Sequence, residues 1–221
     1  MESVVSKSRQ IKNDVTRMYS VASINLGMGI YSGLRAFGAL AFGGASGDSS
    51  YIDAEGVHDI GDTSVYLARA YTFSKDPTAK DYNKKFRFIT YSIVGGLATA
   101  LCVKTGIDLV SNVNNFQSDE FFTNESLQNR AYKLGDSMIF LSGNGAGYKI
   151  STSVESDTPI ADQMKHHART DWVASSIAAG ANMGGVVVPF MSEIGGIFMA
   201  GYTAKEMNPF TDEEKHGSHK H

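Results

Sequence analysis

Long apolar stretches alternate with polar ones along the chain. The stretches without any charge run from Met18 to Leu34, Phe88 to Val103 and Trp172 to Ser192, and apolar character resumes after Glu193. A helix needs about 20 mostly apolar residues to cross a bilayer, so these stretches are candidate membrane helices.

Two further segments, Tyr51 to Phe73 and Ser126 to Lys149, have helix-like spacing but carry several charges each. A break near Pro189 divides the last apolar region in two. The chain has 4 prolines and 23 glycines, which suits closely packed helices better than a turn-rich β-sandwich. We therefore expect an all-α bundle of six helices, near residues 15–43, 51–73, 86–110, 126–149, 159–183 and 186–204.

The basic residues lie on alternate connections between these helices. Residues 36–68, 105–129 and 170–204 contain no Lys or Arg. Basic residues are found instead in the N-terminal arm, in the connection between the second and third helices, in the connection between the fourth and fifth, and in the tail. This asymmetry follows the positive-inside rule, and it predicts an integral membrane protein with six spans and both termini cytoplasmic.

Net charge and mean hydropathy limit which classes of protein this chain can belong to. With 20 basic and 23 acidic residues the net charge is −3, which argues against nucleic-acid binding. A mean hydropathy of −0.17 is low for a polytopic membrane protein and keeps a soluble bundle as an alternative. Arg35 and Arg69 fall inside predicted spans, where a charge is costly.

Three regions follow from these patterns. Residues 1–14 form a polar N-terminal arm, residues 15–204 the helical domain, and residues 205–221 a polar tail with three histidines. The tail is either a loose metal-capturing segment or simply a polar end.

Two segments share one spacing of metal-ligating residue types. His58 precedes Asp62 by four residues, and His167 precedes Asp171 by the same interval. On a helix these positions share a face, and two facing pairs would supply two nitrogen and two oxygen ligands, a set that suits tetrahedral Zn²⁺. The alternative is a pair of ordinary surface helix contacts. Asp59 points away from the His58 face, which predicts an interface charge or one on the route of a cation.

These segments resemble a known family. The stretch from Asp53 to Thr63 is similar to the second membrane helix of the cation diffusion facilitator transporters, and the stretch from Asp162 to Ser176 is similar to their fifth. The resemblance covers residues 15–204. Because 17 residues follow Ala204, we expect either a member that lacks the cytoplasmic domain after the sixth helix or a truncation.

The resemblance implies a function and a site. The transported ion would be Zn²⁺, or Co²⁺, Mn²⁺, Fe²⁺ or Cd²⁺, exchanged for protons by a homodimer in the membrane. Its ligands would be His58, Asp62, His167 and Asp171. Because histidine has a reference pKa near 6.5, metal binding there displaces protons at cellular pH, which couples the two ions.

Other chemistry lacks support in the sequence. The glycines of residues 143–147 lack the Lys-Ser/Thr of a phosphate loop, and Cys102 lies in an apolar segment without a partner for nucleophilic catalysis. We therefore expect no enzyme activity. Two rival hypotheses stay open: a soluble or peripheral helical protein that binds metal without moving it, and a helical membrane or scaffold protein whose His/Asp pairs are incidental.

Overall fold

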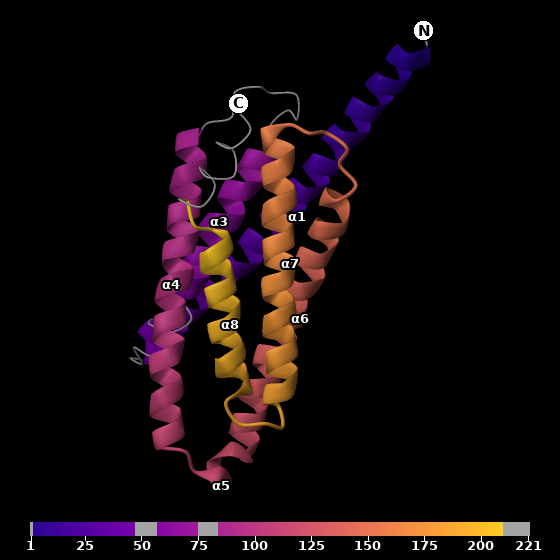
Figure 1. The fold of residues 1–221 in the computed structure, drawn as a ribbon. Helices are drawn as coiled ribbons and strands as arrows, with labels where there is room; N and C mark the ends of the chain where they lie inside the picture. The colour runs from indigo at the N-terminus through magenta and orange to yellow at the C-terminus, as the bar shows by residue number, and fades with distance from the viewer. Residues whose placement is uncertain (1, 47–56, 75–83, 210–221) are drawn as a thin grey trace. The chain divides into compact units, whose positions relative to one another are not determined.

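Every regular element in the computed structural model is a helix. The structure describes residues 2–46, 57–74 and 84–209. Within that part of the chain the helices are α1 (Glu2–Ser46), α3 (Val57–Phe73), α4 (Lys84–Asn114), α5 (Ser118–Phe121), α6 (Asn124–Ser151), α7 (Pro159–Gly185) and α8 (Met191–Glu206) (Figure 1). The all-α class is therefore confirmed for these residues.

The long helices coincide with the predicted ones and differ at two places. α1 begins at Glu2, so residues 2–14 continue the first helix instead of forming a separate arm. The four-residue helix α5 lies in the connection between α4 and α6, where no helix was predicted. Residues 51–56 of the predicted second helix and residues 210–221 of the predicted tail lie outside the described part of the chain.

The chain divides into two compact units. The first unit comprises residues 1–83 and 143–169, and the second comprises residues 84–142 and 170–221. The boundary falls inside α6 and α7, so each of these helices contributes to both units.

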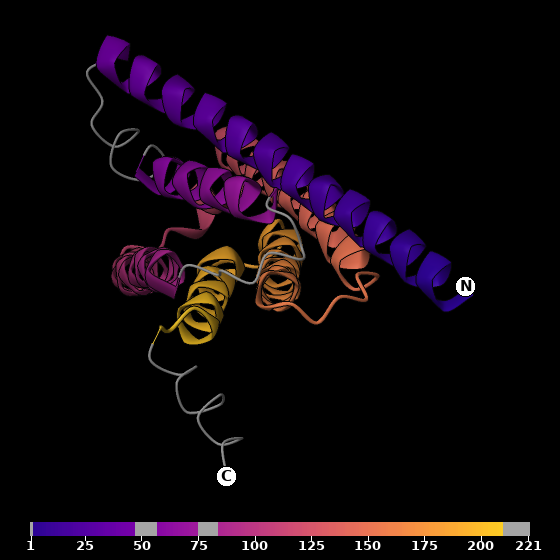
Figure 2. The ribbon, with the colours of Figure 1, turned by 90° about the horizontal axis from the view of Figure 1, so that it is seen from above.

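In the first unit α1 packs along α3 (Figure 2). Met18 and Val21 of α1, Phe73 of α3, and Ile160 and Met164 of α7 form a hydrophobic core. Near the start of α1 a polar contact fixes the connection between α6 and α7. The buried Asp14 carboxylate accepts hydrogen bonds from the backbone N–H groups of Glu155 (3.2 Å) and Ser156 (2.9 Å). These bonds satisfy amide groups that would otherwise lack an acceptor.

In the second unit α4 packs along α8, and small residues set their separation (Figure 1). A Cβ atom added at Gly95 of α4 would lie 2.7 Å from the backbone oxygen of Met207. The thiol of Cys102 donates to the carbonyl of Ile197 at 3.7 Å. On the other side of α8, a Cβ atom at Gly195 would collide with Ala181 of α7. Glycine at these positions lets the backbones approach closely.

Large apolar side chains lie on the outside of both units. The most exposed include Phe37 (72%), Leu34 (66%), Ile107 (65%) and Phe198 (66%). One described helix segment, Phe88–Asn114 of α4, is long and apolar enough to cross a membrane, and 11% of its most apolar window is buried. Its apolar surface is therefore turned outward rather than into a core.

Candidate functional site

The predicted ligands occupy two helices. His58 and Asp62 lie one turn apart at the start of α3, and His167 and Asp171 lie one turn apart in the middle of α7. Both pairs therefore have the helical spacing that places two side chains on one face. The side chain of His58 lies outside the described residues.

Among the predicted ligands whose side chains the structure describes, His167 is the most buried. Its exposed fraction is 1%, and its ring lies 6.1 Å from the ring of Phe73 and 6.2 Å from that of His166. Its Nε2 atom is 3.1 Å from Nε2 of Gln163, one turn earlier on α7. The Gln163 amide therefore helps to fix the orientation of the buried imidazole ring.

Asp62 and Asp171 are half-buried. Phe73, which contacts His167, follows Asp62 by eleven residues, a rise of about 16 Å along α3. Among the described side chains, no group of three His, Cys, Asp or Glu residues is close enough to hold a metal ion. The four-residue site that includes His58 therefore stays a prediction.

A buried ion pair lies next to the predicted site on α3. The Asp59 carboxylate is 3.5 Å from Nε of Arg35 on α1, and the two side chains are 1% and 16% exposed. The sequence predicted Asp59 to be an interface charge or one on a cation route, and the structure places it in the interface between α1 and α3. The pairing also explains Arg35, because a buried charge costs several kcal/mol unless an opposite charge offsets it.

Arg69 on α3, the second arginine inside a predicted span, is also buried. Arg69 is 3% exposed, and its guanidinium group lies 5.8 Å from the centre of the Tyr66 ring. The Tyr66 hydroxyl is in turn 3.1 Å and 3.2 Å from the two amide atoms of Asn144 on α6. No local sequence pattern marks this tyrosine and asparagine as partners, because they are 78 residues apart.

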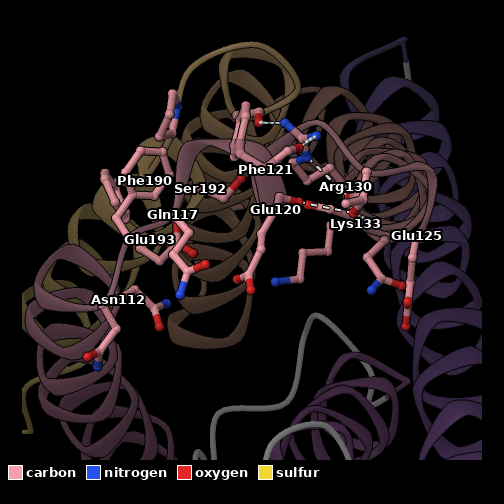
Figure 3. Close-up of a pocket in the computed structure, with 17 residues that line it drawn as sticks. Asn112, Gln117, Glu120, Phe121, Glu125, Arg130, Lys133, Phe190, Ser192 and Glu193 are labelled. Atoms are coloured by element: carbon pink, nitrogen blue, oxygen red, sulfur yellow. Dashed lines mark hydrogen bonds between the residues drawn. The ribbon is translucent and has the colours of Figure 1, made fainter.

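The second unit contains a cavity of about 540 Å³ at the ends of its helices (Figure 3). Arg130 of α6 donates hydrogen bonds to the carbonyls of Phe121 (2.5 Å) and Val186 (2.7 Å), and its guanidinium lies 3.7 Å from the centre of the Phe121 ring. Glu120 and Lys133 extend into the same space. Arg130 therefore connects α6 to α5 and to the segment before α8 on one side of the cavity. We call these contacts the Arg130 anchor.

One feature at this cavity departs from ordinary backbone geometry. Phe190, directly before α8, has φ of 65°, which is rare for a bulky side chain. Its ring lies 5.1 Å from that of Phe116 at 64°, an edge-to-face packing that holds the residue in place.

No protein-family model, curated protein or solved structure matches the chain. Function therefore has to be inferred from the residues and contacts described above.

Proposed function

We propose that this chain is a divalent-cation transporter of the cation diffusion facilitator type. It crosses the membrane six times with both termini in the cytoplasm, acts as a homodimer, and exports Zn²⁺ or a similar ion in exchange for protons. The transported ion is bound by His58, Asp62, His167 and Asp171.

The observation that carries this proposal is the burial of His167, at 1% exposure, in a helical protein that exposes many large apolar side chains. Water favours the reverse arrangement, with apolar side chains inside and ionisable groups outside. In lipid an inward-facing ionisable residue is costly and is retained for binding or relay of ions. Exposed side chains such as Phe37 and Ile107 would then face acyl chains.

The donor chemistry supports a transition-metal ion as the substrate. An imidazole nitrogen and carboxylate oxygens suit Zn²⁺, and both histidines must be unprotonated to bind it. Proton uptake by the same histidines would release the ion on the side where protons are abundant. Access that alternates between the two membrane faces would convert this exchange into antiport.

A second candidate function is favoured by a different observation. Among the described helices, one segment, in α4, meets the length and composition needed to span a bilayer. A soluble or peripheral protein with the same helices would bind the metal ion without moving it. Recovery of the chain from the cytosolic fraction without detergent supports this candidate.

Zinc flux into proteoliposomes tests the transport proposal. We expect the wild-type protein to carry Zn²⁺ into the vesicles while protons leave them. We expect Asp62→Ala and Asp171→Ala to abolish that flux. Asp108→Ala is the matched control, because Asp108 is an exposed acid paired with Lys104 on α4. Full flux in both site variants would overturn the proposal.

A further inference from the structure

The cavity of about 540 Å³ in the second unit has an excess of acidic side chains (Figure 3). Glu120 of α5, Glu125 of α6 and Glu193 of α8 line it. Within the described part of the chain, none of these three carboxylates forms a hydrogen bond or an ion pair. They come from the two stretches 105–129 and 170–204, which contain no Lys or Arg. The carboxylates are therefore available to a ligand from solution.

Two basic side chains line the same cavity, and one of them is already bonded. The Arg130 guanidinium group donates hydrogen bonds to the backbone carbonyls of residues 121, 126 and 186. Lys133 is exposed, and its ammonium group has no partner among the described residues. Three unpaired carboxylates thus face one unpaired ammonium group. This excess of negative charge attracts a cation.

The carboxylates are spread over the cavity and do not converge on one point. Figure 3 shows Glu193 and Glu125 on either side of Glu120. Among the described side chains, no three acidic, His or Cys groups lie close enough to hold a metal ion, whose oxygen ligands have to meet at about 2.0–2.6 Å from one centre. An aliphatic polyamine fits this spacing better, because methylene chains separate its ammonium groups.

Apolar side chains complete the lining. Phe116, Phe121 and Phe190 line the cavity, and the rings of Phe116 and Phe190 pack edge to face with their centres 5.1 Å apart. The left-handed backbone of Phe190, with φ of 65°, directs the chain into α8 three residues before Glu193. Methylene groups pack against such rings, and ammonium groups are attracted to the ring faces. A cavity of about 300–1,000 Å³ that combines apolar walls with a few polar groups is typical of a site for a small organic ligand.

We propose that this cavity binds an aliphatic polyamine. Glu120 and Glu193 accept hydrogen bonds from two of its ammonium groups, and the phenylalanine rings contact its methylene chain. Lys133 weakens this binding by repulsion between like charges. The inference uses none of the residues of the proposed metal site, so its failure would leave the metal-transport proposal unchanged.

Equilibrium dialysis with radiolabelled spermidine tests the proposal on the full-length protein in non-ionic detergent. We expect saturable binding of one spermidine per chain, and we expect the affinity to fall as the salt concentration rises. The compound n-butylamine should compete more weakly, because its single ammonium group engages one carboxylate at a time. Absence of saturable binding, or equal competition by spermidine and n-butylamine, would overturn the proposal.

Variants that remove single charges show whether this cavity is the binding site. We expect Glu120→Gln and Glu193→Gln each to weaken spermidine binding about 2- to 5-fold, the range for ion pairs that solvent partly screens. Lys133→Gln should strengthen binding by a similar factor. Asp119→Asn is the matched control, because Asp119 directly precedes Glu120 on α5, is exposed and is not among the residues that line the cavity.

These substitutions exchange polar side chains at positions that are not buried, so each variant should keep the helical circular dichroism of the wild type. A loss of affinity in Asp119→Asn as large as that in Glu120→Gln would show unspecific attraction of a cation and would overturn the proposal. Unchanged affinity in both glutamate variants, or no gain of affinity in Lys133→Gln, would overturn it as well.

Discussion

The two units bury different kinds of polar side chain. Among the described residues, the buried charged, amide and imidazole side chains lie in the first unit, and they include Asp14, Asp59, Arg69 and His167. The second unit buries four polar side chains, all with hydroxyl groups: Thr90, Ser137, Thr170 and Ser175. A hydroxyl can bond to a carbonyl one turn earlier on its own helix, as Ser137 does with Leu134 at 2.9 Å.

This difference matters for how the helices are held. A buried carboxylate or guanidinium group needs a partner of opposite charge or many donors, and on α3 that partner comes from α1. The Arg35–Asp59 pair therefore helps to fix α1 against α3 in the first unit. The second unit relies on close approach at small residues and on the backbone bonds of Arg130.

Removal of one member of the buried ion pair should cause the largest loss of stability. Asp59→Ala leaves Arg35 without its 3.5 Å partner carboxylate, so we expect a loss of about 3–5 kcal/mol in unfolding free energy. The fluorescence of Trp172, the single tryptophan, can follow unfolding in detergent. The double variant Arg35→Leu/Asp59→Leu should recover most of the loss. A single variant as stable as wild type would contradict the pairing.

Overpacking tests the second unit. In Gly95→Val the new side chain would begin 2.7 Å from the Met207 carbonyl oxygen, and we expect destabilisation of about 1–3 kcal/mol. Gly96→Val is the matched control, because nothing lies within 4 Å of a Cβ atom there. Thermal unfolding of both variants side by side measures the difference. Equal melting temperatures would show that α4 and α8 are not held by close approach.

The Arg130 anchor gives a smaller effect. Arg130→Ala removes the bonds to the Phe121 and Val186 carbonyls. Because the side chain is partly exposed to solvent, we expect a total loss of about 1.5 kcal/mol, the low end for hydrogen bonds from a charged group. Arg130→Lys should retain part of this stability, because lysine keeps the charge but not the planar fork. Hydrogen exchange of residues 185–193 checks the result: faster exchange is expected in Arg130→Ala, and unchanged exchange would contradict the anchor.

The neutral contact between α3 and α6 should give the smallest effect. Tyr66→Phe removes the hydroxyl that lies 3.1 Å from the Asn144 amide, with an expected cost of about 0.5–1.5 kcal/mol. Tyr132→Phe, at an exposed position of α6, is the control. A cost as large as that of Asp59→Ala would mean that charge is not what distinguishes the first unit.

The sequence predicted helix positions well because charge-free stretches and basic connections mark where helices begin and end. It placed residues 2–14 in an arm separate from the first helix, since a polar helix and a polar arm have the same composition. α5 is too short to give a periodic pattern.

The site was predicted less completely, and the reason is physical. His167 is predicted as a ligand because a histidine and an aspartate one turn apart are visible in sequence, and Gln163 shows the same spacing on its other side. Arg35 with Asp59 and Tyr66 with Asn144 are contacts between helices, so their partners depend on packing that no local pattern encodes. Whether the four predicted ligands converge is decided by the same packing.

The length of α1 has an electrostatic consequence. In the proposed membrane orientation the buried Asp14 marks the cytoplasmic end of the helix packing, and residues 7–13 continue α1 beyond it with exposed side chains. At a rise of about 1.5 Å per residue, Lys12, Arg9 and Lys7 lie about 3, 8 and 10 Å from the level of Asp14. The screening length of physiological salt is about 8 Å. All three distances are comparable to this length, so in that orientation any attraction of these side chains to anionic headgroups would weaken as the salt concentration rises.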